Sequence, residues 1–178
     1  MIPFYTFLAY LVRIPAEIKG MKFGSNSFIG PGYDFLFAPM KGINVGDNVT
    51  IGQRAWLQTV PPATISIGDR TQIGRNVTIS SMKKISIGKE CLLSYNVSVF
   101  DHDHEYKNAD ISPIFSGVTK PQPTKIDDYC FIGAHSFILA GVQLGKHCVV
   151  AANSVVTKSF PAYSMVGGSP ARFIKKLK

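Results

Sequence analysis

The chain has 178 residues, of which 46% are hydrophobic and 17% charged, and this balance indicates one globular domain. So few charges exclude a coiled coil or a long disordered tail, and 16 glycines without a Gly-X-Y period exclude collagen. The net charge of +8 suggests an anionic partner. Because the basic residues are scattered singly and are not interleaved with aromatic residues, we expect no nucleic-acid partner.

The N-terminal segment, residues 1–22, is apolar and aromatic over residues 2–14. It lacks the positive region of a secretory leader and is too short to span about 30 Å of hydrocarbon. Two interpretations stay open: a helix docked on the domain, or an interfacial anchor that makes a peripheral membrane contact through residues 2–14. We therefore expect a cytoplasmic protein, either free or at the inner face of the membrane.

An apolar residue recurs every six positions over residues 23–158, in groups of three. This period fits neither an α-helix, with about 3.6 residues per turn, nor an uninterrupted strand, with a period of about two. It fits short strands joined by turns, so that three units close one triangular coil and each unit points one side chain inward. The positions are Phe23, Ile29, Phe35, Val45, Ile51, Leu57, Ile67, Ile73, Ile79, Ile87, Leu93, Val99, Ile126, Ile132, Ile138, Leu144, Val150 and Val156.

The repeat therefore predicts an all-β fold, a parallel β-helix of about six coils over residues 23–158. Every insertion falls between the third unit of one triplet and the first unit of the next. All inserted loops should therefore leave the prism at one corner, and the longest, residues 100–125, is an excursion loop of the kind that carries function. Residues 159–178 form a basic C-terminal tail.

The cysteines follow the same repeat. Cys91, Cys130 and Cys148 each lie two positions before an interior aliphatic residue, at a second and smaller inward site. We interpret them as small buried hydrophobic residues rather than nucleophiles or metal ligands. Their odd number also argues against a disulfide framework.

Two motifs in this pattern resemble the hexapeptide-repeat acyltransferases, which have a left-handed parallel β-helix. One is Asn-Val-Ser-Val-Phe-Asp-His-Asp-His at residues 96–104; the other is Val-Val-Thr-Lys at 155–158 followed by Gly-Gly-Ser-Pro-Ala-Arg at 167–172. The resemblance covers residues 23–178 and is closest to the maltose and galactoside O-acetyltransferases and the polysaccharide O-acetyltransferases. It implies transfer of an acetyl group from acetyl-CoA to a sugar or glycan hydroxyl, without a metal, in a homotrimer with active sites between subunits.

The reaction needs a general base, and imidazole suits this role because its free pKa is about 6.5. His102 and His104 begin the excursion loop. Eight residues after Asn96, as in the motif of the family, stands His104, which we expect to be the base, with His102 as the alternative. His135 and His147 fall at outward turn positions on different sides of the prism and are interpreted as solvated surface.

A neighbouring carboxylate could hold the base in one tautomer. Asp101, Asp103 and Glu105 all flank the two histidines, and the sequence does not choose between them or exclude ordinary solvated charges.

The resemblance also assigns contacts to coenzyme A. The two alanines would act through the backbone, and the N–H of Ala134 is a candidate donor to the oxyanion. The cations would meet the phosphates of the cofactor, whereas Lys176 and Lys178 are interpreted as solvated charges. The cofactor-binding candidates are Ala134, Ala152, Thr157, Lys158, Arg172 and Lys175.

The chain departs from the sugar acetyltransferases at Gly74, where they carry an acceptor-binding Asn, so the acceptor should not be a simple galactoside or maltose. Three alternatives stay open. The first is N-acetylation of an amino sugar or another small acceptor. The second is a zinc-dependent, carbonic-anhydrase-like site at His102 and His104. The third is a non-enzymatic hexapeptide scaffold.

Overall fold

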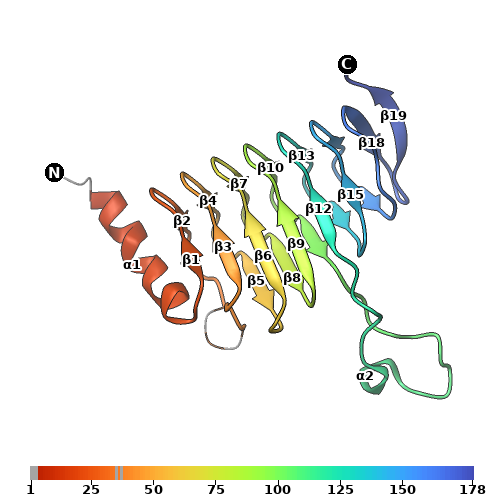
Figure 1. Cartoon of the computed structure of the whole chain (residues 1–178), viewed down its shortest axis with the longest axis horizontal. Coiled ribbons are helices and arrows are strands. Elements are labelled where there is room, and N and C mark those ends of the chain that lie inside the picture. Colours follow the sequence, from red (N-terminus) through yellow and green to blue (C-terminus); the bar gives the residue numbers. More distant parts are fainter. Residues whose placement is uncertain (1–3, 35, 37) are drawn as a thin grey trace.

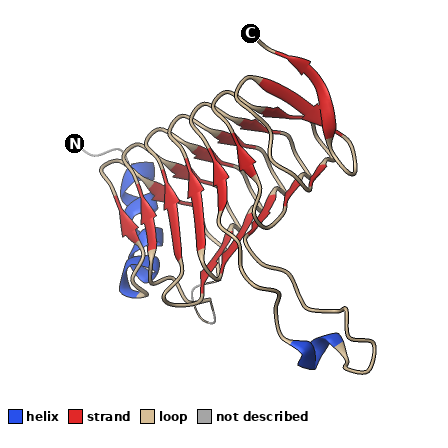
Figure 2. Cartoon of the chain, turned by 45° about the vertical axis from the view of Figure 1, so that its right-hand side comes forward, coloured by secondary structure: helices blue, strands red, loops and turns tan. Residues whose placement is uncertain are grey.

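The computed structural model describes residues 4–34, 36 and 38–178. Short strands wind around one core as a three-sided prism, with one sheet on each side (Figures 1 and 2). Sheet A contains β1 (Lys22–Phe23), β3 (Ile43–Val45), β6 (Thr64–Ile67), β9 (Lys84–Ile87), β12 (Thr124–Ile126) and β15 (Gln143–Leu144). Sheet C contains β5 (Trp56–Thr59), β8 (Thr78–Ser81), β11 (Ser98–Phe100), β14 (Phe137–Ile138) and β17 (Val155–Val156).

Sheet B lies between these two in chain order and extends furthest toward the C-terminus. It contains β2 (Phe28–Ile29), β4 (Thr50–Ile51), β7 (Gln72–Ile73), β10 (Leu92–Leu93), β13 (Phe131–Ile132), β16 (Val149–Val150), β18 (Ser164–Gly167) and β19 (Arg172–Lys176). Strand β18 pairs in parallel with β16, and β19 then turns back antiparallel to β18. The basic C-terminal segment is therefore built onto the end of the prism.

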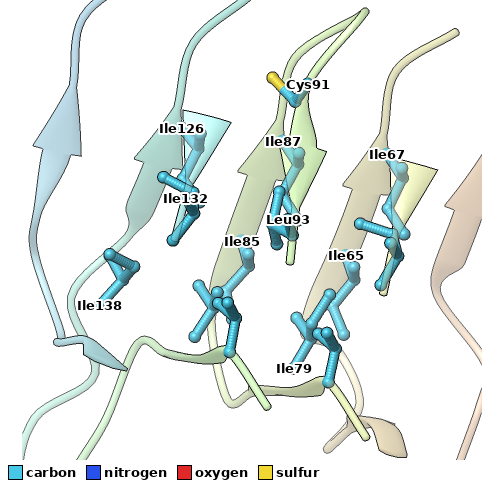
Figure 3. Close-up of a cluster of buried hydrophobic side chains, with 14 of the residues drawn as sticks. Ile65, Ile67, Ile79, Ile85, Ile87, Cys91, Leu93, Ile126, Ile132 and Ile138 are labelled. Carbon is cyan, nitrogen blue, oxygen red and sulfur yellow. The ribbon is translucent and has the colours of Figure 1, made fainter. Parts of the chain in front are cut away.

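The core is a set of aliphatic columns that run along the prism axis. Ile67, Ile87 and Ile126 stand at matching positions of successive coils, because β6, β9 and β12 pair in register (Figure 3). Each hexad position that the structure describes is buried, except for Phe23, which packs partly buried against the core. Phe35 lies outside the described residues. The inward phase of the repeat is confirmed.

Turns between the sheets place polar residues in the left-handed region, where Asn is favoured among residues with a side chain. At the corner between sheets B and C these include Asn76, Asn96 and His135, with φ between 55° and 59°. His147 adopts the same conformation at the corner between sheets A and B. His135 and His147 therefore lie in turns at different corners of the prism, as the repeat predicts.

The inserted segments after β5, β8 and β11 leave at the corner where sheet C is followed by sheet A, as the spacing predicts, whereas the first insertion includes residues outside the described part. The longest joins β11 to β12 and projects well beyond the prism, with a short helix, α2 (Pro113–Ser116), near its tip (Figures 1 and 2). At this tip Ile114 and Phe115 are 79% and 82% exposed.

The helix α1 (Phe4–Ile18) covers the N-terminal end of the prism (Figure 1). Ala16 is fully buried in the core, and Arg13 donates from Nη1 to the carbonyl oxygen of Ser27 at 2.9 Å. The helix also carries three exposed apolar side chains, Leu11, Ile14 and Ile18. No helix in the described part of the chain is long and apolar enough to cross a bilayer. A peripheral membrane contact through residues 2–14 stays a prediction, and residues 2 and 3 lie outside the described part.

Candidate functional site

A pocket of about 670 Å³ lies on the outer face of sheet C, at the corner where the excursion loop leaves the prism. The coils and the beginning of the loop both contribute to it. From the coils it is lined by Trp56, Gln58, Ser80, Met82, Phe100, Leu139, Ala140 and Thr157, and from the loop by His102, Asp103, His104 and Val118.

His102 is oriented by a buried carboxylate. Its Nδ1 lies 2.9 Å from Oδ1 of Asp101, whose side chain is fully buried, and the His102 side chain is only 13% exposed. The ring of Phe100 meets the imidazole edge-on, with centroids 6.4 Å apart. Because the carboxylate engages Nδ1, the ring is held in one orientation and Nε2 is the nitrogen left to exchange a proton.

Asp101 also ties the loop to the preceding coil. Its carboxylate accepts hydrogen bonds from Ser81 Oγ at 2.7 Å and from the backbone N–H groups of Met82, Lys83 and Lys84 at 2.7 to 2.8 Å. Burial alone would raise the pKa of Asp101, but the hydrogen bonds from Met82, Ser81 and His102 outweigh it and hold that pKa below its ordinary value of 3.8. The carboxylate is therefore ionised at neutral pH.

His104 lines the same pocket in a different way. Its side chain is exposed, and its backbone N–H donates to Oδ1 of Asp103 at 2.8 Å. Its backbone also forms a short antiparallel bridge with Val118 in the returning arm of the loop. The structure thus records a positioned backbone at His104 and a positioned imidazole at His102.

The two arms of the loop are joined to each other near the prism. The N–H of Thr119 donates to the carbonyl oxygen of Asp103 at 2.8 Å, and Thr119 Oγ1 accepts from the Asp103 N–H at 3.1 Å. The N–H of Gln122 donates to the carbonyl oxygen of Asp101 at 2.7 Å. These bonds fix the segment that carries both histidines against the mouth of the pocket.

Of the cofactor-binding candidates, Thr157 lies in the pocket lining with both histidines. Ala134 and Ala152 lie on neighbouring coils at the corner between sheets B and C, away from that lining; the N–H of Asn153 donates to the carbonyl oxygen of Ala134 at 2.9 Å. Lys158 follows directly after Thr157, and its Nζ lies 5.7 Å from the ring centre of Phe160.

Arg172 and Lys175 lie further along, on the exposed strand β19. All the cofactor-binding candidates therefore stand on the C-terminal side of His102, but the structure brings only Thr157 into contact with the pocket.

The remaining histidines and the cysteines lie elsewhere. His135 is exposed, as expected, whereas His147 is half-buried between the stacked rings of Tyr129 and Tyr163, at 4.7 and 5.1 Å, so its interpretation as a freely solvated side chain is wrong. The cysteines are free and at most 2% exposed, which confirms them as core residues. In the part of the chain that the structure describes, no three His, Cys, Asp or Glu side chains group as metal ligands would.

Sequence reasoning missed the apolar wall of the pocket, namely Trp56, Met82, Phe100 and Leu139. Trp56 stands one position before an inward aliphatic residue and therefore faces outward, and a large aromatic residue there was the available signal. Met82 carried no signal, since it belongs to an inserted turn outside the repeat.

The repeats match the family model described as the hexapeptide repeat of succinyl-transferase over residues 64–100 and 123–158. The fold is the left-handed parallel β-helix of about six coils that the sequence predicts, and the matched residues are hexapeptide repeats of that fold.

Among curated proteins, 66 residues of the chain are 42% identical to 2,3,4,5-tetrahydropyridine-2,6-dicarboxylate N-acetyltransferase from Staphylococcus aureus. This match covers 35% of the chain and 28% of the relative, so the chain matches much less than half the length of that enzyme.

Among solved structures, AntD, an N-acyltransferase from Bacillus cereus solved with dTDP and coenzyme A, matches with a TM-score of 0.75 and 23% identity over 91% of this chain and 87% of that one. A hexapeptide-repeat acetyltransferase from Vibrio cholerae matches with a TM-score of 0.56 and 29% identity over 72% and 73%. The polysialic-acid-specific acetyltransferase NeuO matches with a TM-score of 0.59 and 19% identity over 88% and 81%.

Proposed function

We propose that the chain is an acetyl-CoA-dependent O-acetyltransferase that acts on a sugar or glycan hydroxyl. The observation that carries this proposal is the buried Asp101–His102 pair at the mouth of a pocket on a hexapeptide β-helix. The names of the similar proteins support it, because they describe acyl or acetyl transfer, in one case with coenzyme A bound.

His102 is the general base in this proposal. A hydroxyl becomes a good nucleophile only as its proton is removed, and Nε2 of an imidazole held through Nδ1 can take that proton. The oxygen then attacks the thioester carbon, the C–O bond forms, the C–S bond breaks, and the proton passes to the sulfur that leaves. The N–H of Ala134 remains the proposed donor to the transient oxyanion, and because Ala134 lies away from the pocket of its own chain, a neighbouring copy in the proposed trimer would supply it.

The choice of His102 over His104 rests on the carboxylate. Counting from Asn96 favours His104, but the orienting carboxylate is Asp101 and its partner is His102. An unoriented, exposed imidazole must lose rotational freedom whenever it reacts, and this raises the barrier.

Coenzyme A is proposed to lie along the C-terminal coils, with its pantetheine arm beside Ala134, Ala152 and Thr157. Lys158, Arg172 and Lys175 would meet the phosphates, for which an ammonium and a forked guanidinium are suited.

Arg172→Ala should weaken coenzyme A binding. Loss of a charge-assisted hydrogen bond should raise the dissociation constant roughly tenfold or more. Calorimetric titration of the variant with coenzyme A measures this change, and Lys176→Ala, which removes a cation from the same strand, is the matched control. Equal weakening in both variants would show a general charge effect and remove the assignment of Arg172.

N-acetylation of an amino sugar is the second candidate, because two of the matching proteins are named as N-acyl or N-acetyltransferases. One assay separates the two: release of free coenzyme A thiol from acetyl-CoA, followed with neutral sugars and with amino sugars as acceptors. Turnover with hydroxyl acceptors alone supports O-transfer, and turnover with amines alone replaces it by N-transfer.

A homotrimer with sites between subunits is proposed from the outer faces of the prism. Sheet A is polar outside, with Asn44, Ser66, Ser86, Lys125 and Gln143. Sheets B and C expose Leu92, Phe131 and Phe137, and Tyr95 lies at the corner between them and is 52% exposed.

Apolar faces on either side of one edge suit a three-fold axis near that edge, where each copy meets both neighbours. Light scattering should give the mass of three chains, and Tyr95→Glu should lower it by placing a charge in the contact. A wild-type mass of a single chain would refute the trimer.

A further inference from the structure

The pocket beside His102 has two sides of different chemistry. Toward the C-terminal coils it is formed by Leu139 and Thr157, on the side where the cofactor-binding candidates lie. Toward the N-terminal coils it is formed by Trp56 and Gln58 on β5 and by Ser80 on β8. The second side belongs to coils that carry no cofactor-binding candidate and has no role in the mechanism above.

Trp56 is the most distinctive residue of this second side. It is the single tryptophan of the chain, and 42% of it is exposed on the outer face of sheet C. Large exposed aromatic side chains in a concave site commonly contact a ligand. An indole ring has a negatively polarised face, on which the weakly positive C–H bonds of a sugar ring can stack.

Polar groups stand next to the indole. Gln58 lies two residues further along the same strand, so it lies on the same face as Trp56, and it pairs with Ser80 on β8. The amide and the hydroxyl can each donate and accept hydrogen bonds. A pure channel for an acyl chain would not need such groups, whereas a sugar presents an apolar ring face and hydroxyls at its edges.

The charge of the lining decides which sugars fit. Of the described residues that line the pocket, none is Lys or Arg, and Asp103 contributes a carboxylate. A uronate or sialate would bring its own negative charge beside Asp103 with no Lys or Arg among these residues to pair with it, and burying an unpaired charge is costly.

We propose that Trp56, Gln58 and Ser80 form the acceptor subsite and that it binds a neutral sugar ring, stacked on Trp56 and hydrogen-bonded at its edge by Gln58 and Ser80. This rests on the proposed function and deepens it by naming the acceptor class. The acceptor hydroxyl then lies between this subsite and His102, with the acetyl donor on the opposite side.

Because Trp56 is the single tryptophan, its fluorescence reports directly on this subsite. The wild-type protein is titrated, without acetyl-CoA, with neutral methyl hexosides and methyl deoxyhexosides and, at equal concentrations, with methyl glucuronide and methyl sialoside. We expect a saturable change in emission with at least one neutral glycoside and none with the anionic ones. No saturable change with any neutral glycoside up to tens of millimolar would overturn the proposal, and so would a preference for the anionic sugars.

Variants test the subsite in turnover. Trp56→Ala should raise the KM for the acceptor about tenfold, which corresponds to about 1.4 kcal/mol, while the KM for acetyl-CoA stays unchanged. Trp56→Phe keeps an aromatic face and should recover part of this loss. Phe115→Ala, at an aromatic position that is 82% exposed near the tip of the excursion loop and outside the pocket lining, is the matched control. A rise in the KM for acetyl-CoA in place of the acceptor KM would assign Trp56 to the donor and contradict the proposal.

Failure of this inference and failure of the proposed function are distinguishable. Sugar-dependent fluorescence without coenzyme A binding would leave the sugar site standing and refute the transferase. Coenzyme A binding and thiol release, with Trp56 silent toward sugars and responsive to long-chain acyl-CoA, would leave the transferase and make this wall an acyl channel.

Discussion

His102→Ala should lower kcat by about 10²- to 10⁴-fold, the range that a general base contributes, while the fold stays intact. The imidazole is the proposed proton acceptor, and without it Asp101 still accepts the hydrogen bonds from Ser81 and from the N–H groups of residues 82–84 that tie the loop to the prism. Thiol release from acetyl-CoA at saturating acceptor measures kcat, and circular dichroism checks the fold.

A second variant, His104→Ala, tests which of the two loop histidines is the base. His104→Ala should have a smaller effect on kcat than His102→Ala, because no carboxylate is recorded beside its ring among the described residues. Asp110→Ala, an exposed side chain of the same loop outside the pocket lining, should behave as wild type. A loss confined to His104→Ala would return the role of base to His104, and full activity in both loop variants would remove the loop from the mechanism.

Asp101→Ala should cost both stability and activity. The change leaves the backbone N–H groups of Met82, Lys83 and Lys84 without their common acceptor, and we expect a loss of about 2–4 kcal/mol in the free energy of unfolding. His102 also loses its orientation, so kcat should fall. Urea unfolding at fixed protein concentration measures the first effect, and Asp110→Ala, an exposed carboxylate of the same loop, should leave the midpoint unchanged.

The stability of the protein at acid pH should also depend on Asp101. The pKa of Asp101 is lower in the folded state than its ordinary value of 3.8, so its ionised form stabilises the fold above that value, and this contribution is lost as the pH falls through the folded pKa. Wild type should therefore lose more stability than Asp101→Asn as the pH drops below about 4. Parallel acid profiles for the two proteins would show that Asp101 has no depressed pKa.

The fold was predictable from sequence because its determinants are local and repeated. Inward aliphatic residues such as Ile79 and Ile132 are fully buried in the same way in successive coils. The six-residue period therefore predicts which side chains point inward, which sheet each strand joins and at which corner the insertions leave. The packing of the N-terminal helix was harder to predict from the sequence. Ala16 is buried and Ile18 is exposed, yet both are apolar, so the hydrophobic pattern alone does not distinguish the buried side of the helix from the exposed side.

The site was predictable only in part. The position of the excursion loop and the presence of His102 and His104 followed from the repeat and from the family motif. Which imidazole is oriented depends on Asp101, whose carboxylate is bound by groups in residues 81–84, one coil away and outside any motif. Trp56 reaches the pocket only because the coils stack, and such contacts between coils carry no signal within a single hexad.

The measurement that most directly tests the central claim is calorimetric titration of the wild-type protein with acetyl-CoA and coenzyme A, since it requires no knowledge of the acceptor. The proposed function predicts saturable binding near one ligand per chain, weakened in Arg172→Ala. No binding up to millimolar ligand would contradict a coenzyme A-dependent transferase. The β-helix would then stand as a scaffold or, if analysis found stoichiometric metal in the purified protein, as a metal site.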